Sequence, residues 1–469
     1  MNPSREPLLE HQTRGVEWIE HTPFGLLADE PGLGKSRQAI HAYDGGRNLV
    51  IAPAMVLDGA TWDDELAAWS DHPERWTQAS YTGLNAREKL GGSATRPIAG
   101  QPRPEFEGPW DAIIVDEAHY IKNAGTNWTE TIHTLGKKSG AVLAMTGTPI
   151  SHWAPDLFTT LQLLNPRETA PGKRFGSKWR WLEGWFDVQA SRFGGPNARV
   201  VGELLGCTPR CSLRPAHSPC KHYRKFAEDN LGDQFLRRLR EDCLDLPPLR
   251  IQRVATPMDS NARRMYRELR DGFATDTAAG VPLEAWSTGS QITLMTKLTT
   301  SAWLLEENPK TPPRGGKFDL LKYDLTQRTR PTLVVAHYQD TVDAGTAVAQ
   351  ELGLRAFSIH GGTSRADRRS IVQDFKAGRV DVLSASLEVI SEGLQLTAAD
   401  MAIFVEKSYK PSRNKQARDR IHRLGQNRPC TVREYITPKS IDFNRTTLLD
   451  QKTDHQMRVL SAASFLEIA

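Results

Sequence analysis

A short segment early in the chain has the residue types that bind nucleotide phosphates. Residues 29–36 read Asp-Glu-Pro-Gly-Leu-Gly-Lys-Ser. Glycines let backbone N–H groups approach a phosphate, the following lysine neutralises the terminal phosphates, and the adjacent hydroxyl can contact Mg²⁺. Because Asp29 stands where the general G-x-x-x-x-G-K-[ST] pattern has its first glycine, a glycine-rich turn without a ligand is the alternative. We expect ATP to be held by Gly32, Leu33, Gly34, Lys35 and Ser36.

Two acidic residues follow an apolar run and suit hydrolysis of that nucleotide. Asp116 and Glu117 come directly after residues 112–115, Ala-Ile-Ile-Val. Ligands of open α/β sheets sit at the carboxyl ends of strands. Asp116 is therefore expected to hold Mg²⁺ together with Ser36, and Glu117 to orient and deprotonate the attacking water. An acidic pair can also simply begin a helix. Its occurrence in one chain with residues 29–36, here called the phosphate loop, favours catalysis.

Two further groups could complete such a site. Residues 146–149, Thr-Gly-Thr-Pro, follow the apolar run 142–145 and offer hydroxyls that can sense the γ-phosphate. Arg420 and Arg423 lie within residues 416–426 and are expected one turn apart on a helix face. Such a pair suits arginine fingers, which stabilise the transferring phosphoryl group when two lobes close. An arginine-rich helix face in solvent is the alternative.

The elements that position these residues are strands alternating with helices. Short apolar runs that read as buried strands occupy residues 49–52, 112–115, 142–145, 332–336, 357–359, 380–383 and 402–405. This alternation predicts an α/β fold with two parallel-sheet lobes and helical and irregular insertions. We assign residues 1–245 to an N-terminal, ATP-binding lobe with a basic protrusion at about 166–235, and expect a helical stretch at 235–244. Residues 246–469 form the C-terminal lobe, with a helical insertion at about 259–312.

Composition is that of a globular chain with an internal basic segment. Of 469 residues, 39% are hydrophobic and 25% charged, and the net charge is +4. No signal peptide or membrane span is evident, and five cysteines form no disulfide framework. We therefore expect an intracellular, cytoplasmic protein with no membrane partner.

The basic segment is a candidate surface for nucleic acid. Residues 166–225 hold 12 Lys and Arg against 4 Asp and Glu. We expect a protrusion that contacts DNA phosphates, although basic clusters are often only solvated faces. The tryptophans at 179, 181 and 185 could equally be its hydrophobic core. The expected contacts are Lys173, Arg174, Lys178 and Arg180.

The same segment also contains a candidate metal site. Cys207, Cys211, Cys220 and His222 follow the spacing C-x₃-C, eight residues, C-x-H, with His217 as the competing fourth ligand. Thiolates and an imidazole at such intervals can close a tetrahedral Zn²⁺ shell. A polar, proline-rich loop could depend on the metal for its fold. Incidental thiols of a mobile insert are the alternative.

Taken together, the motifs resemble those of the Swi/Snf-family ATPases of helicase superfamily two. The resemblance covers nearly the whole chain and is carried by residues 8–12, 29–36, 116–119, 146–149, 235–238, 246–248, 384–386, 392–396, 399–400 and 419–426. It implies two RecA-like lobes. It further implies that Gln12 contacts adenine, that Gly393 contacts the nucleotide and that Ser384 contacts DNA.

Three segments depart from the family pattern. Val389-Ile390 stands where two glycines are usual, Tyr409-Lys410-Pro411 replaces Trp-Asn-Pro, and Ser151-His152 replaces a polar pair. None of these changes removes a catalytic group.

The function implied by the resemblance is a DNA-dependent ATPase that moves along double-stranded DNA and remodels or anneals what it meets. The expected cofactors are ATP and Mg²⁺, with Zn²⁺ as a structural candidate. We expect a monomer in a compact single-motor form, nucleoid-associated, of bacterial or viral source, with a loading or accessory protein as a further partner. A strand-separating DNA or RNA helicase is the first alternative. A catalytically silent nucleic-acid-binding scaffold is the second.

Overall fold

The computed structural model forms two compact units. It describes residues 6–58, 61–91, 94–150, 153–190, 199–207, 211, 220–278, 288–306, 311–390 and 394–464. Unit 1 comprises Met1–Leu244 and Lys452–Ala469, and unit 2 comprises Asp245–Gln451. The boundary after Leu244 lies one residue before the boundary at residue 245 that was assigned from the sequence. The C-terminal segment differs from that assignment, because Val459 and Leu460 of α18 (Ile441–Ser464) are buried in the core of unit 1.

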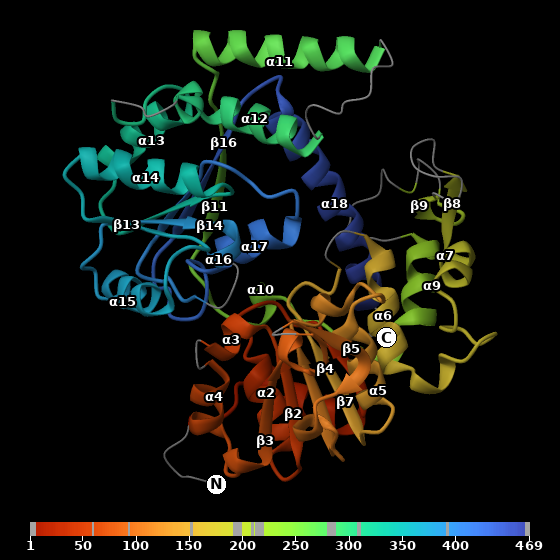
Figure 1. Ribbon diagram of the computed structural model, residues 1–469. Coiled ribbons are helices and arrows are strands. Elements are labelled where there is room, and N and C mark those ends of the chain that lie inside the picture. Colours follow the sequence, from red (N-terminus) through yellow and green to blue (C-terminus); the bar gives the residue numbers. More distant parts are fainter. Residues whose placement is uncertain are drawn as a thin grey trace. The chain divides into compact units, whose positions relative to one another are not determined.

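Unit 1 is built on a six-stranded parallel sheet with the order β10-β1-β7-β6-β2-β3. Strands β2, β3 and β7 of this sheet are labelled in Figure 1. Its strands are β1 (Phe24–Leu27), β2 (Asn48–Ala52), β3 (Trp76–Ser80), β6 (Ala112–Asp116), β7 (Ala141–Met145) and β10 (Phe235–Leu236). Alternate residues of each strand point to opposite faces. In β6, Ile113 and Val115 join one hydrophobic cluster, and Ala112 and Ile114 join another.

Helices cover both faces of this sheet. One face is packed by α1 (Glu10–His21), α2 (Lys35–Tyr43) and α4 (Thr61–Trp69), which supply Ile19, Ile40 and Trp62 to its cluster. The other face is packed by α5 (Asn127–Gly136), α6 (Phe158–Leu164), α7 (Lys178–Trp185), α9 (Lys221–Asn230) and the end of α18. The short helices are α3 (Ala54–Asp58) and α10 (Arg240–Cys243).

Two antiparallel hairpins interrupt the alternation of strands and helices. They are β4 (Asn85–Gly91) with β5 (Ala94–Pro102), and β8 (Phe186–Ala190) with β9 (Arg199–Leu204). The second hairpin lies in the basic segment. There Trp181 and Trp185 pack on Phe226, and their ring centroids lie 5.9 and 5.4 Å, respectively, from the ring centroid of Phe226. Two of the three tryptophans of this segment therefore serve as core, whereas Trp179 is 46% exposed.

Unit 2 repeats the architecture with a six-stranded parallel sheet of order β11-β16-β15-β12-β14-β13. Its strands are β11 (Leu249–Ala255), β12 (Thr332–Ala336), β13 (Ala356–Ile359), β14 (Val382–Ser386), β15 (Met401–Phe404) and β16 (Cys430–Ile436). Its helices are α11 (Ser260–Ala278), α12 (Thr288–Thr300), α13 (Lys317–Thr326), α14 (Gln339–Glu351), α15 (Arg365–Lys376), α16 (Leu387–Ile390), α17 (Pro411–Asp419) and the first part of α18.

The expected α/β fold with two parallel-sheet lobes is confirmed, and each of the seven apolar runs overlaps a strand. The expectation of a helical stretch at 235–244 is wrong in its first part. Residues Phe235–Leu236 form β10, which pairs with β1, and helix begins only at Arg240. Among the described residues, no helix combines the length and the apolarity needed to cross a bilayer.

Candidate active site

Three polar loops meet at one edge of the unit 1 sheet. They follow β1, β7 and β6, which are adjacent and parallel. The register aligns Met145 with Leu27 on one side and with Asp116 on the other. Since parallel strands end at the same edge, the sheet itself brings together the phosphate loop, the acidic pair and residues 146–149.

The phosphate loop has the backbone geometry expected of it. Gly32 and Gly34 have φ of 95° and 74°, a region that glycine enters without strain, and α2 begins at Lys35. A Cβ on Gly34 would lie 2.3 Å from Nε2 of Gln12, which itself donates to the carbonyl of Leu33. Gln12 thus lies against the loop whose nucleotide it is expected to read.

Lys35 connects the loop to the acidic pair. Its Nζ donates to the carbonyl oxygen of Asp29 at 2.7 Å. Burial lowers the pKa of Lys35, while the charges of Glu117, Asp29 and Asp116 act in the opposite direction. The lysine therefore lies in the electrostatic field of both catalytic candidates, at the N-terminus of a helix suited to anions.

Asp116 is half-buried and is held by two aromatic side chains. Trp62 Nε1 donates to its Oδ2 at 3.0 Å, and the Tyr81 hydroxyl donates to its carbonyl oxygen at 2.7 Å. Burial, with the neighbouring Glu117 charge, raises the pKa of Asp116 to about 6. A carboxylate whose pKa is raised by desolvation and by a neighbouring negative charge is stabilised by a nearby cation, which fits the expected Mg²⁺ ligand. Trp62 and Tyr81 were not identified from the sequence.

Glu117 is fixed by residues of the neighbouring loop. Its backbone has φ of 52°, an uncommon value for a residue with a side chain. The Thr146 hydroxyl donates to Glu117 Oε2 at 3.2 Å, and Nδ1 of His119 lies 3.1 Å from the same oxygen. The Thr148 N–H donates to the Thr146 hydroxyl at 3.1 Å. The expected water-activating carboxylate is therefore coupled to the loop expected to sense the γ-phosphate.

The third loop also lies against the phosphate loop. A Cβ on Gly147 would come within 2.6 Å of Cγ and 2.8 Å of Cδ of Pro31. A larger residue at this position would push the two loops apart. The glycine of the 146–149 segment thus has a packing role that its sequence context did not reveal.

Arg238 is a site residue that sequence reasoning missed. Its guanidinium donates to both carboxylate oxygens of Asp29, Nε to Oδ1 at 3.0 Å and Nη2 to Oδ2 at 2.5 Å. Arg238 arrives here because β10 pairs with β1, aligning Leu236 with Leu27. The fully buried Asp29 is thus paired, which accounts for an aspartate at the usual glycine position. An acid in a phosphate-binding loop was a signal that a cation should lie nearby.

The expected site residues of unit 2 differ in how far the structure describes them. Gly393 lies outside the described residues. Ser384 is fully buried in β14, between β12 and β13, and its expected contact with DNA stays a prediction. Helix α17 ends at Asp419, so Arg420 and Arg423 lie beyond it and not on a helix face as expected. Arg420 Nε donates to the carbonyl oxygen of Ile390 at 2.9 Å.

The candidate DNA contacts lie at the start of α7 and just before it. Lys173, Arg174 and Arg180 are exposed and Lys178 is partly buried. The Arg174 guanidinium lies over the ring of Phe175, 5.0 Å from its centroid. These positive charges are accessible to solvent, as a phosphate contact requires.

The four candidate zinc ligands are brought together. Ligand atoms of Cys207, Cys211, Cys220 and His222 all lie within 4.8 Å of one another. His217, the competing ligand, lies outside the described residues.

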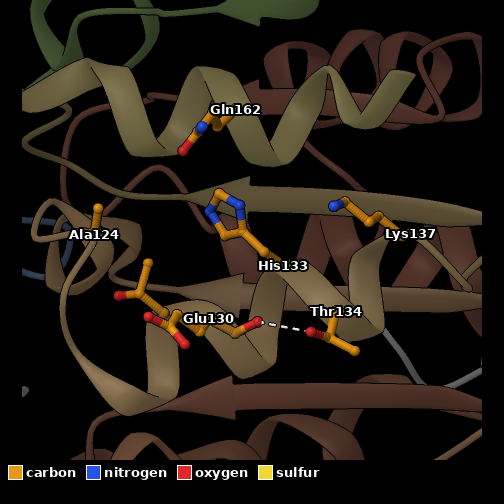
Figure 2. A pocket seen from close by; sticks show the side chains of 7 residues that line it. Ala124, Glu130, His133, Thr134, Lys137 and Gln162 are labelled. Carbon is orange, nitrogen blue, oxygen red and sulfur yellow. Dashed lines mark hydrogen bonds between the residues drawn. The ribbon is translucent and has the colours of Figure 1, made fainter. Parts of the chain in front are cut away.

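A separate pocket of about 200 Å³ lies beside α5 (Figure 2). Glu130, His133, Thr134 and Lys137 line it, together with Ala124, Thr129 and Gln162. Burial lowers the pKa of His133 to about 4, so the ring is neutral near pH 7. None of the lining residues belongs to the three loops, so this pocket is not part of the candidate site.

Family comparisons match two parts of the chain. Residues 101–302 match the family described as SNF2-related domain, and residues 316–425 match the helicase conserved C-terminal domain. The phosphate loop lies before the first match, so its assignment rests on its own geometry and motif.

Curated relatives align with almost all of the chain. The chromatin structure-remodeling complex subunit snf21 of Schizosaccharomyces pombe is 25% identical over 98% of this chain and 40% of that protein. The DNA annealing helicase and endonuclease ZRANB3 of Bos taurus is 26% identical over 96% of this chain and 40% of that protein. The chain thus spans less than half the length of these relatives.

Among solved structures, the Sulfolobus solfataricus SWI2/SNF2 ATPase core in complex with dsDNA is 20% identical, with a TM-score of 0.40. That alignment covers 99% of this chain and 96% of the solved one. The C-terminal part of the Fun30 ATPase domain is 15% identical, with a TM-score of 0.41, and covers 47% of this chain and 98% of that one.

Proposed function

The chain belongs to the Swi/Snf family of helicase-like, DNA-dependent ATPases of helicase superfamily two, and from this premise we propose that it couples ATP hydrolysis to movement along double-stranded DNA. The observation that carries the hydrolytic part is the linkage of three loops at one sheet edge. There Thr146 contacts Glu117, and Lys35 lies in the field of Glu117 and Asp116. A binding scaffold without catalysis would not need this linkage.

In the proposed mechanism, Glu117 orients the attacking water and accepts its proton. Thr146 and His119 hold the carboxylate in place, so that little reorganisation is needed during reaction. Lys35 and the backbone N–H groups of residues 32–36 neutralise the phosphates. Gln12, packed on Gly34, contacts the base.

The proposed metal cofactor of this site is Mg²⁺, held by Asp116 and Ser36. The half-buried Asp116 carboxylate fits a hard cation, and Ser36 lies in the first turn of α2, beside the phosphate-binding glycines. When bound, Mg²⁺ supplies positive charge to the phosphate oxygens. Trp62 donates to one oxygen of Asp116 and so helps to orient the carboxylate.

Arg420 and Arg423 of unit 2 are proposed to stabilise the transferring phosphoryl group. Guanidinium groups suit this role because they remain charged and present planar donors. Hydrolysis would then depend on both units, and changes in their relation during the ATP cycle would move the chain along one DNA backbone. By its relatives, the chain would remodel or anneal DNA or protein–DNA complexes.

Displacement of a triplex-forming strand tests translocation. A third strand bound at one end of a linear duplex is released by a motor that tracks the duplex, without separation of the duplex strands. We expect ATP-dependent release by the parent chain and none by Glu117→Gln. Release that does not require ATP hydrolysis, or no release by an active ATPase, would contradict translocation.

A tailed duplex distinguishes the alternative function. A strand-separating helicase would displace the shorter strand of such a duplex in the presence of ATP. The proposed translocase would release the third strand of a triplex and leave the tailed duplex paired.

A further inference from the structure

The Cys/His cluster is assembled by the end of a hairpin and the start of a helix. Cys207 follows β9, which ends at Leu204, and Cys220 is the N-cap of α9. His222 lies in the first turn of α9, and Cys211 lies between these elements in sequence. Two secondary-structure elements and the connection between them thus direct ligand atoms toward one point.

Two distances within the cluster match the edges of a tetrahedral shell. With Zn–S bonds of about 2.3 Å and Zn–N bonds of about 2.0–2.1 Å, a tetrahedron has S···S edges of about 3.8 Å and S···N edges of about 3.6 Å. The Sγ atoms of Cys207 and Cys220 are 3.7 Å apart, and Cys220 Sγ is 3.6 Å from His222 Nδ1. A disulfide would need an S–S distance of about 2.05 Å.

The backbone beside the cluster makes room for the imidazole. Gly206 has φ of 78°, and a Cβ there would lie 2.9 Å from Nε2 of His222 and 3.0 Å from its Cδ2. The ring therefore lies against a glycine on its Nε2 side and turns Nδ1 toward the sulfur of Cys220. The orientation of the histidine is set by packing as well as by sequence spacing.

The cluster is joined to the core of unit 1 through α18. Arg458 Nη1 donates to the carbonyl oxygen of Cys211 at 2.8 Å. His455 Nδ1 lies 3.1 Å from the hydroxyl of Tyr223, the residue after His222. Cys207 and Cys211 also pack against the hydrophobic cluster that contains Val459. A metal here would hold the hairpin, α9 and the C-terminal helix against one another.

We propose that Cys207, Cys211, Cys220 and His222 bind one structural Zn²⁺ ion. Three thiolates and one imidazole are ligands that Zn²⁺ prefers, and four protein ligands leave no position for a substrate, so the ion stabilises the fold. The ion is expected to fix the base of the basic protrusion. This inference is independent of the proposed ATP chemistry, and its test does not use activity.

The first measurement is the metal content of the whole chain purified without added metal. We expect about one equivalent of zinc per chain, as a four-ligand site requires. Replacement of zinc by Co²⁺ should give the visible absorption of a tetrahedral thiolate-bound ion. Zinc far below one equivalent that added Zn²⁺ does not raise, or a Cys207–Cys220 disulfide in protein prepared with thiol reductant, would overturn the proposal.

Matched variants keep the test independent of misfolding. Cys207→Ser with Cys220→Ser should lose zinc, whereas Cys243→Ser, which changes a cysteine of unit 1 outside the cluster, should retain it. His222→Cys keeps four ligands and should retain zinc, whereas His222→Ala should bind it more weakly. Equal zinc content in His222→Ala, the double serine variant and the parent would show that these residues are not the ligands.

Discussion

The active site and the Cys/His cluster of unit 1 are assembled in opposite ways. The candidate active-site residues come from positions as distant as Gln12 and Arg238, and a parallel sheet brings the loops at this site to one edge. The cluster takes all its ligands from residues 207–222, and a metal would supply much of its local order. Loss of a catalytic group should therefore impair chemistry in the first region, and loss of a ligand should impair local folding in the second.

The largest expected effect is on turnover at the sheet edge. Glu117→Gln keeps the shape of the side chain but removes the base, so ATP turnover should fall by about 10² or more while ATP binding remains. Steady-state hydrolysis and nucleotide binding measured on the same preparation check this. A variant that hydrolysed ATP at the parent rate would remove Glu117 from the mechanism.

The second effect should appear in stability, because Arg238 neutralises a fully buried carboxylate. Arg238→Met leaves Asp29 without its ion-pair partner, which should lower the free energy of unfolding by about 3 kcal/mol or more. Denaturant unfolding measures the loss. Adding Asp29→Asn to Arg238→Met should recover part of the lost unfolding free energy, because the buried charge is then gone. If the losses of the two single variants simply added in the double variant, the Asp29–Arg238 ion pair would not be the cause.

A smaller effect is expected from unit 2. Arg420→Ala with Arg423→Ala should lower DNA-stimulated hydrolysis by about tenfold or more and leave ATP binding by unit 1 nearly unchanged. Arg428, another arginine of unit 2, provides a matched control, because its Nη2 donates to the carbonyl of Ala398 and it has no proposed catalytic role. A double variant that responds fully to DNA would exclude the proposed role.

The smallest effect concerns the solvent-accessible basic residues at the start of α7 and just before it. Neutralising Lys173, Arg174, Lys178 and Arg180 should weaken DNA binding severalfold and flatten its dependence on salt by roughly one unit of slope per lost phosphate contact. Fluorescence anisotropy over a range of salt concentrations measures both quantities. An unchanged slope would show that these charges are only solvated.

Sequence patterns predicted the parts of this molecule that depend on local composition. Apolar runs such as 112–115 predicted the buried strands. Motif spacing singled out Lys35, Asp116 and Glu117, whose catalytic roles stay predictions. The four-ligand cluster was also predictable, because its ligands are close in sequence. These features need no knowledge of how distant segments pair.

Features created by distant pairing could not be predicted in the same way. Strand β10 has two residues, too few to show the alternation of apolar and polar residues that marks a strand. Its pairing with β1 nevertheless places Arg238 beside the phosphate loop. The contacts of Trp62 and Tyr81 with Asp116 likewise depend on elements far apart in sequence. The burial of Ser384 was likewise not evident from the pattern, because it follows from the pairing of β14 with both β12 and β13.

The most direct test of the central claim is ATP turnover by the purified chain in Mg²⁺ buffer, with and without linear double-stranded DNA. Glu117→Gln is measured in parallel. The account predicts low basal turnover that rises severalfold with duplex DNA, and near-background turnover of the variant in both conditions. Turnover of the parent that is the same with and without DNA, or turnover of the variant equal to that of the parent, would contradict it.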